Sequence, residues 1–201
     1  MKPIKTAIIF ALVLAPAIAS AQGYYGGGYR NGFHHRRMGR LAFGFSVGLG
    51  GMWDGGGRIE CDACNYNPLS FEVDGHVGGM LTSRFALLFE VQANVQTVSP
   101  NGGDTQTLSQ GAAMVAGQYW LTPQLWIKGG IGFAHLELDY ADQGPADPVD
   151  SGFAIMGAIG YEVFSAPYFA VDLQARLIEG SYDGIDDHIT AGNVGLGFNW
   201  Y

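Results

Sequence analysis

The feature that most constrains the fold is a strict alternation of apolar with small or polar residues, which is clearest at positions 194–201. One face of this segment is apolar and the other is small or polar: Val194, Leu196, Phe198 and Trp200 oppose Gly195, Gly197 and Asn199. A period of two residues is that of a β-strand, and one apolar face predicts contact with an apolar medium on that side only. The segment ends on Trp200 and Tyr201, and such rings concentrate at the headgroup level of a bilayer. The pattern therefore predicts a strand that contacts lipid.

Residues 1–21 are typical of a secretory signal peptide. Lys2 and Lys5 form a positive start, an apolar run covers residues 8–15, and Ala-Ser-Ala at 19–21 offers a cleavage site. The apolar run is well short of the ~20 residues that a membrane-spanning helix needs. Only helices and closed barrels satisfy all backbone polar groups in lipid, so an exported chain without a helical anchor would enter a membrane as a closed barrel.

Composition supports the same class. Hydrophobic residues make up 48% of the chain and charged residues only 14%, while 32 of the 201 residues are glycine. Many glycines alternate with apolar residues, as over residues 42–50, and a narrow barrel interior accepts small residues at such positions. The formal net charge is −8, and four of the ten basic residues lie at positions 30–40, before most of the first strand. We expect no nucleic-acid binding by this acidic body, since such binding needs a basic face.

Eight alternating runs follow a Gly-, Tyr- and Arg-rich segment at residues 22–39, which we expect to be a flexible periplasmic lead-in. The runs predict strands within a barrel domain at 40–201: 40–52, 69–81, 84–98, 105–121, 124–139, 151–164, 168–181 and 188–200. Each exceeds the roughly 9–11 residues that cross a bilayer as a tilted strand. In the run 124–139 the apolar parity shifts after Phe133 to Leu136 and Leu138, which we interpret as a bulge or as the strand leaving the membrane.

The connections alternate in length, which is the more specific signal. Tight turns at 82–83, 122–123 and 165–167 alternate with longer loops at 53–68, 99–104, 140–150 and 182–187. This alternation, with an even strand count, is typical of bacterial outer-membrane barrels. The predicted fold is an eight-stranded antiparallel up-and-down transmembrane β-barrel, with termini and tight turns in the periplasm and long loops outside. A soluble lipocalin-like barrel is the alternative, but its exterior would be polar.

The parity that places apolar residues outside places charged ones inside. The predicted interior residues are Glu72, Asp74, His76, Glu90, Lys128, Glu162, Asp172 and Arg176. Charges in a narrow interior need partners. We expect Lys128 to pair with Glu162 on the next strand, and Arg176 to reach Glu162 or, across the lumen, Glu90. The hypothesis is a structural ion-pair network that fills the barrel; the alternative is a gate in a narrow pore, although eight strands leave room mainly for side chains.

These features together resemble the small outer-membrane β-barrel proteins of the OmpA-type transmembrane barrel superfamily. The pattern Asn193-x-Gly195-x-x-Phe198-x-Trp200 resembles the C-terminal signal by which the barrel-assembly machinery recognises its substrates. The usual pattern ends on the last aromatic residue, whereas Tyr201 follows here. The resemblance implies the outer membrane of a Gram-negative bacterium, with its lipid and lipopolysaccharide as partners. Larger members add a peptidoglycan-binding domain after the barrel, and that activity is not expected here.

Two cysteines lie in the first long loop. Cys61 and Cys64 predict a disulfide that closes a small loop of an exported chain. A metal pair is the alternative, but it would need further ligands such as Glu60 or Asp62.

Two polar clusters outside the strands offer weaker metal sites. His34-His35 could bind a transition metal, although a solvated linker is favoured. Asp183, Asp186 and Asp187 could attract divalent cations such as those that bridge lipopolysaccharide, although a solvated acidic loop is favoured. No cofactor is expected.

The sequence favours a non-enzymatic protein with a structural or surface-interaction role. The runner-up is a narrow pore for small solutes or ions. The least favoured alternative is a lipid A-modifying hydrolase, with His188, Thr190 and either Asp187 or Glu179 as its reacting groups. A threonine in place of a serine nucleophile weakens that interpretation.

Overall fold

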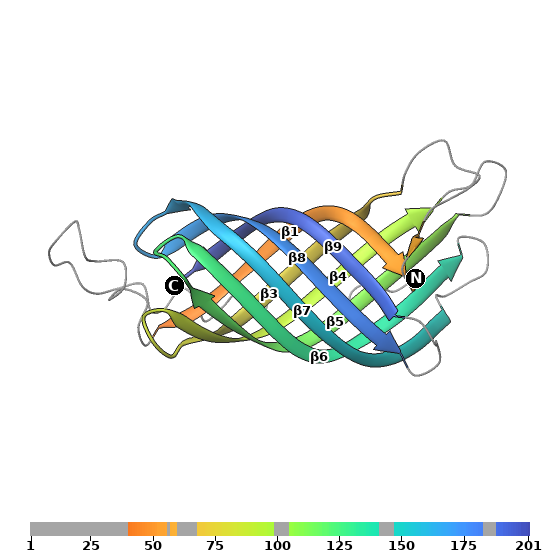
Figure 1. Cartoon of the computed structure of the whole chain (residues 1–201), viewed down its shortest axis with the longest axis horizontal. Coiled ribbons are helices and arrows are strands. Elements are labelled where there is room, and N and C mark those ends of the chain that lie inside the picture. Colours follow the sequence, from red (N-terminus) through yellow and green to blue (C-terminus); the bar gives the residue numbers. More distant parts are fainter. Residues whose placement is uncertain (1–39, 56, 60–67, 99–104, 141–146, 183–187) are drawn as a thin grey trace, which may run out of the picture. The chain divides into compact units, whose positions relative to one another are not determined.

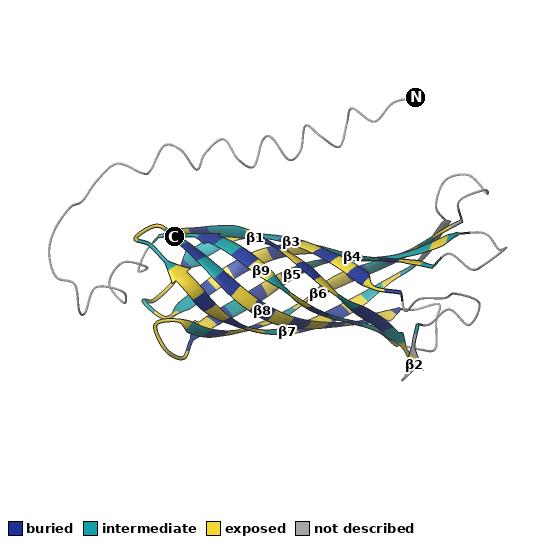
Figure 2. Cartoon of the chain, turned by 90° about the horizontal axis from the view of Figure 1, so that it is seen from above, coloured by how far each residue is buried: buried dark blue, intermediate teal, exposed yellow. Residues whose placement is uncertain are grey.

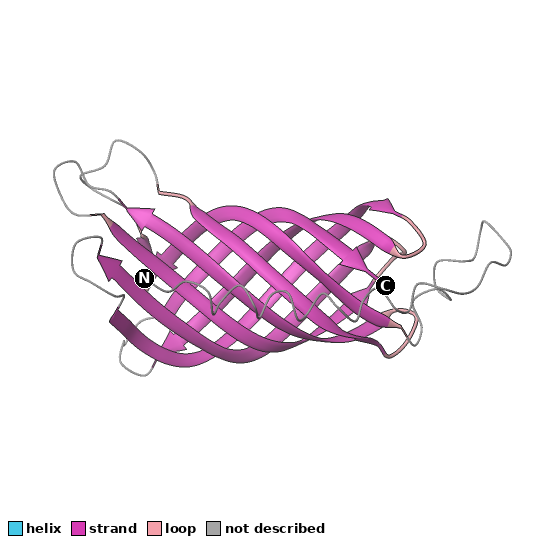
Figure 3. Cartoon of the chain, turned by 180° about the vertical axis from the view of Figure 1, so that it is seen from behind, coloured by secondary structure: helices cyan, strands magenta, loops and turns pink. Residues whose placement is uncertain are grey.

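A computed structural model describes residues 40–55, 57–59, 68–98, 105–140, 147–182 and 188–201. The described residues form strands joined by turns and loops (Figure 3). The strands are β1 (Leu41–Asp54), β2 (Gly57–Arg58), β3 (Ser70–Met80), β4 (Phe85–Val98), β5 (Gln106–Trp120), β6 (Leu125–Tyr140), β7 (Asp147–Ser165), β8 (Phe169–Tyr182) and β9 (His188–Trp200). In this part of the chain there is no helix with the length and apolarity to cross a membrane.

The sheet closes on itself. In the barrel wall, β1 pairs antiparallel with β3, and each later strand pairs antiparallel with the one that follows it. The last strand, β9, then pairs with β1 (Figure 1). The seam is long, since its register runs from Phe43 opposite Trp200 to Asp54 opposite Ile189. Within the described ranges the wall therefore has eight strands, and the predicted eight-stranded antiparallel up-and-down barrel is confirmed.

The first long connection begins later than predicted. Strand β1 continues to Asp54, and the two-residue β2 folds back on it, with Trp53 opposite Arg58 and Asp54 opposite Gly57. Gly55 makes this reversal with φ at 46°, a left-handed conformation that glycine adopts without strain. The residues assigned to a loop from position 53 thus begin as a short β-hairpin beyond the barrel wall.

Exposed and buried residues alternate along every long strand, as Figure 2 shows by colour. On β4, Phe89 is 51% exposed and Val91 is 49% exposed. The residues that alternate with them are buried: Glu90 is 0% exposed and Gln92 is 2% exposed. The apolar residues therefore face outward and the charged residues face inward. This is the reverse of a soluble barrel and the arrangement of a lipid-facing one.

The parity shift expected after Phe133 has a different origin from a bulge in its own strand. Strand β6 pairs with β5 without interruption up to Tyr140, and the inward and outward positions of β6 continue to alternate. What changes is chemistry: the outward positions become polar at His135, Glu137 and Asp139. The irregularity lies in the partner strand β7, which shifts register between Leu136 and Glu137 of β6. The bulge expected in residues 124–139 therefore lies in the neighbouring strand β7. The alternative, that β6 leaves the membrane after Phe133, stays a prediction, and the polar outward residues agree with it.

Two tight turns share one hydrogen-bonding pattern. In the β3–β4 turn, the Leu81 amide donates to Phe85 and the Thr82 hydroxyl accepts from the Arg84 amide at 3.2 Å. In the β5–β6 turn, the Leu121 amide donates to Leu125, and the Thr122 hydroxyl accepts in the same way from the Gln124 amide at 3.3 Å. It also accepts from the Leu125 amide at 2.9 Å. Threonine hydroxyls accept readily from nearby amides in turns, so these two short connections hold their strands in register.

Candidate functional site

A cluster of charged side chains crosses the middle of the barrel. We call it the central cluster and define it by Glu72 and Asp74 of β3, Glu90 of β4, Lys128 of β6 and Arg176 of β8. All five residues are at most 5% exposed. The inward parity of their strands brings them together, so residues far apart in sequence meet in the lumen.

Arg176 is the centre of this cluster. Its Nη1 atom lies 2.7 Å from Glu90 Oε1 and 3.2 Å from Glu72 Oε1, and its Nη2 atom lies 2.9 Å from Asp74 Oδ2. Nη1 also donates to Gln92 Oε1 at 3.0 Å. The guanidinium presents several donors in one plane, so a single side chain can bind acceptors on β3 and β4 from the opposite wall.

Lys128 binds the same carboxylate from another side. Its Nζ donates to Glu90 Oε2 at 2.9 Å and lies 5.4 Å from the centre of the Trp126 ring. The expected pairing of Lys128 with Glu162 is therefore wrong, because Lys128 binds Glu90. The long lysine side chain reaches across the lumen, whereas the residue that directly faces it on β7 is Ala158.

Glu162 belongs to a second cluster nearer the tight turns. Its Oε1 accepts from Trp120 Nε1 at 2.9 Å, and its Oε2 accepts from the Ser165 hydroxyl at 2.6 Å. Nearby, Asp172 Oδ2 accepts from Asn199 Nδ2 at 2.6 Å. Of the two partners expected for Arg176, the structure thus brings Glu90 to it and places Glu162 in this separate cluster.

Amide side chains fill the lumen toward the long loops. Asn193 Nδ2 donates to Asn94 Oδ1 at 2.7 Å, and Gln110 Nε2 donates to the Tyr182 hydroxyl oxygen at 3.0 Å. Gln96 Nε2 donates to the Ile59 carbonyl at 2.9 Å. The sequence interpretation did not single out these amides as a group, although the inward parity of β4 places a run of Gln and Asn on that face.

The central cluster consists of ion pairs between buried carboxylates and buried cations. Three carboxylates face the cations of Lys128 and Arg176, and His76 Nδ1 lies 3.6 Å from Asp74 Oδ1. Asp74, His76 and Glu90 place ligand atoms within 4.8 Å of one another. Because Arg176 and Lys128 already bind both carboxylates, a metal ion would face two adjacent cations. The arrangement therefore favours an ion-pair plug over a metal centre.

The predicted assembly-signal residues lie along the barrel seam. Phe198 stacks on Phe45 with ring centres 5.0 Å apart, and Trp200 stacks on Phe43 at 5.4 Å. Gly195 faces Gly48 across the seam, and a β-carbon at 195 would collide with the Val47 carbonyl oxygen. The aromatic positions thus join the last strand to the first on the outside, while the glycine allows close approach of the backbones.

Tyr201, which extends the expected C-terminal pattern by one residue, turns into the barrel. Its amide donates to the Tyr168 carbonyl at 3.1 Å, and its ring packs edge-on against Trp120 with centres 5.7 Å apart. Its hydroxyl lies 3.4 Å from Glu162 Oε1. The added residue follows the inward parity of β9 and covers the cluster around Glu162.

Several other predicted sites lie outside the described residues: the signal peptide and lead-in, the His34-His35 pair, the Cys61 and Cys64 disulfide, and the acidic Asp183, Asp186 and Asp187. The hydrolase alternative is described in part. Thr190 lies opposite Glu179 in the β8–β9 ladder, and His188 lies opposite Ser181. Among the described residues, no hydrogen bond joins His188 to Thr190 or Glu179.

Comparison with known proteins identifies the fold. No protein-family model matches the chain, and no curated protein matches its sequence. Among solved structures, the attachment invasion locus protein Ail of Yersinia pestis, in complex with the heparin analogue sucrose octasulfate, aligns with a TM-score of 0.55 and 11% identity, covering 79% of this chain and 98% of that one. Neisserial surface protein A aligns with a TM-score of 0.53 and 9% identity, covering 80% and 95% respectively. The chain thus has the fold of the small eight-stranded outer-membrane barrels.

Replacing Arg176 with methionine should destabilise the barrel strongly. The change leaves Glu72, Asp74 and Glu90 buried without their shared cation, which costs about 3–5 kcal/mol in comparable buried pairs. The free energy of unfolding, measured by urea titration of tryptophan fluorescence in lipid vesicles, should fall by that amount. The exposed Arg84 of the β3–β4 turn offers a control, and Arg84→Met should change stability by less than about 0.5 kcal/mol. Equal stability of the two variants would contradict the central role of Arg176.

Replacing Phe198 with alanine should impair closure of the seam. The stacked pair with Phe45 contributes about 0.5–1.5 kcal/mol beyond its buried area. Leu196 lies on the same face of β9 and offers the matched control Leu196→Ala, which removes no ring pair. The yield of folded, heat-modifiable protein should fall further for Phe198→Ala than for Leu196→Ala. Equal yields would show that the aromatic pair adds nothing to closure.

Proposed function

We propose that this protein is an integral outer-membrane protein of a Gram-negative bacterium with a structural or surface-interaction role. The observation that carries the proposal is a closed ladder whose outer wall is apolar while its charged residues lie inside. In lipid, an open sheet edge would leave backbone groups unsatisfied, and closure from β1 to β9 removes that edge. The fold shared with Ail and Neisserial surface protein A supports the same location.

We infer the orientation from the lengths of the connections. The tight turns after β3, β5 and β7 lie at one end of the barrel, and the strand ends that flank the four longer connections lie at the other (Figure 1). Outer-membrane barrels place short turns in the periplasm and long loops outside. In this orientation Phe43, Phe45, Phe198 and Trp200 form an aromatic group near the periplasmic interface, where the barrel-assembly machinery would act on the last strand.

The filled lumen favours a structural or surface role over transport. The central cluster, the cluster around Glu162 and the amides near Gln110 occupy successive levels of the interior, and their side chains bind across it. A conducting path would have to separate Arg176 from three carboxylates. This supports a closed barrel that presents its loops, with the narrow pore as the weaker candidate.

Charge restricts the partners that the loops would meet. By sequence the long connections carry an excess of aspartate, including Asp183, Asp186 and Asp187. Such loops favour divalent cations, including those between lipopolysaccharide molecules, and repel polyanions. A sulfated ligand of the kind bound to Ail is therefore disfavoured for this chain.

The location and orientation can be tested together. The protein expressed in a Gram-negative host should fractionate with the outer membrane and migrate faster on gels before boiling than after it, because the closed barrel resists detergent unfolding. Protease added to intact cells should cleave within the long connections, such as 141–146, and spare the tight turns at 82–83 and 122–123. Cleavage confined to the tight turns would reverse the orientation, and recovery in the soluble periplasmic fraction would refute the membrane proposal.

The closed lumen predicts no steady ion conductance. Refolded protein in a planar bilayer should show no reproducible channel steps, because the Arg176 cluster spans the interior. The heat-modifiable shift of the same sample confirms that the protein tested is folded. Reproducible steps of uniform size from the wild-type protein would favour the pore.

A further inference from the structure

Three polar residues form a hydrogen-bonded chain on the outer wall. His135 and Glu137 lie at successive outward positions of β6, and Ser151 lies directly opposite His135 on β7. His135 Nδ1 is 3.2 Å from Ser151 Oγ, and His135 Nε2 is 3.1 Å from Glu137 Oε1. One imidazole therefore joins a hydroxyl to a carboxylate, which is the geometry that prepares a serine as a nucleophile.

Ser151 faces His135 within the regular part of the β6–β7 ladder, next to an irregularity in β7. Leu136 pairs with Asp150 and Glu137 pairs with Pro148, so Val149 between them is the additional residue of this strand. Such bulges redirect side chains and interrupt the ladder locally. The interrupted stretch ends next to Ser151, whose amide donates to Asp150 Oδ1 at 2.7 Å.

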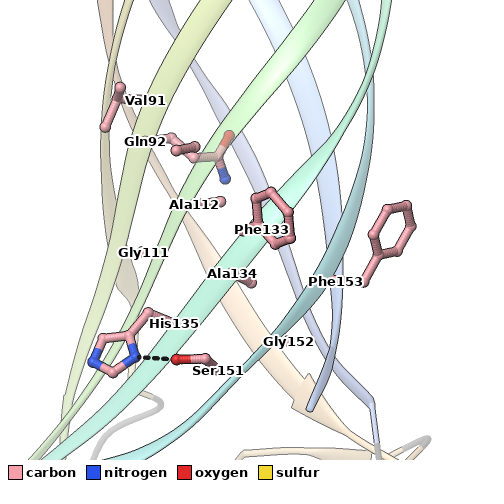
Figure 4. A pocket seen from close by; sticks show the side chains of 11 residues that line it. Val91, Gln92, Gly111, Ala112, Phe133, Ala134, His135, Ser151, Gly152 and Phe153 are labelled. Atoms are coloured by element: carbon pink, nitrogen blue, oxygen red, sulfur yellow. Dashed lines mark hydrogen bonds between the residues drawn. The ribbon is translucent and has the colours of Figure 1, made fainter. Parts of the chain in front are cut away.

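An apolar groove begins at this polar chain. It has a volume of about 770 Å³ and runs over β5 between Val91 of β4 and Phe133 of β6, because the outward residues of β5 there are only Gly111 and Ala113. Figure 4 shows His135 hydrogen-bonded to Ser151 at one end of the lining residues, with Phe133 above them. A hydrocarbon chain could therefore lie in this groove with one end beside Ser151.

We propose that Ser151, His135 and Glu137 form an acyl-ester hydrolase site for a membrane lipid whose chain lies in this groove. The position supports this substrate class. Phe133 is 78% exposed on the apolar outer wall, and the outward residues become polar from His135 onward. The site therefore lies where hydrocarbon gives way to headgroups, which is the level of the ester bonds of membrane lipids. This activity goes beyond the proposed structural role and rests on its lipid-facing wall.

The reaction balances with water as the only co-reactant. Ser151 Oγ attacks the ester carbonyl carbon while His135 Nδ1 takes the hydroxyl proton, and Glu137 stabilises the resulting imidazolium through Nε2–H. The bond from the carbonyl carbon to the alcohol oxygen then breaks, and the proton passes from His135 to that oxygen. Water next attacks the acyl-serine with His135 as base, which releases the carboxylic acid and regenerates the Ser151 hydroxyl.

The test uses the full-length protein without its signal peptide, refolded in detergent micelles, with a fluorophosphonate probe and p-nitrophenyl esters of four and twelve carbons. We expect the probe to modify Ser151, as located by peptide mass spectrometry, and hydrolysis of the longer ester to be preferred. Ser151→Ala and His135→Ala should lower hydrolysis by about 100-fold or more, and Glu137→Gln by about 10-fold or more. Ser181→Ala, an exposed serine on neighbouring β8, is the matched control and should retain both activities.

A separate variant tests whether the groove holds the hydrocarbon chain. A β-carbon at Gly111 would lie 4.0 Å from its nearest neighbours, the Gln92 and His135 carbonyl oxygens, so Gly111→Leu fits the fold and fills the groove. It should remove the preference for the longer ester. A folded, heat-modifiable wild-type protein that neither reacts with the probe nor hydrolyses either ester faster than Ser151→Ala would overturn the hydrolase site while leaving the membrane proposal intact. Retained chain-length preference in Gly111→Leu would overturn the groove as the chain's position.

Discussion

Closure of the backbone ladder between β1 and β9 is the constraint on which the rest of the structure depends. An apolar outer wall can contact lipid only if every strand has two partners, because an open edge would leave amide and carbonyl groups without hydrogen bonds. The paired glycines at 48 and 195 let the two backbones approach, and the rings of Phe45 and Phe198 stack over the same seam. Closure in turn creates the narrow interior that all inward side chains must share.

That interior explains why so many charges lie in a barrel with a small lumen. Inward positions cannot contact lipid or bulk water, so the carboxylates of Glu72, Asp74 and Glu90 require cations within the same space. Arg176 and Lys128 supply them from the opposite side. The outer wall must be apolar where it contacts lipid, and it departs from this character at His135, Glu137 and Ser151, the residues of the proposed hydrolase site.

The alternation of side chains was sufficient to predict the strands, their inward and outward faces and the closed fold. It was not sufficient to predict partners across the lumen. Lys128 was expected to bind Glu162 because they lie on adjacent strands, but long side chains in a narrow barrel reach across it and Glu90 is the partner. The hydrolase alternative likewise began from His188, whereas a serine is hydrogen-bonded to His135. The outward parity of His135 and Glu137 was visible in the sequence, but the facing of Ser151 depends on the register of β7 against β6, which the alternation of side chains does not set.

The sequence by itself determined the class of the protein, because a two-residue period with one apolar face and alternating connection lengths admits few folds besides a lipid-facing barrel. Only the tertiary structure decided which buried charges meet, where Tyr201 lies and which outer-wall residues form a hydrogen-bonded chain. The physical reason is that parity is a local property of each strand, repeated along it by the backbone. Side-chain partnership depends on register and on distances across the lumen, which arise only when all eight strands close.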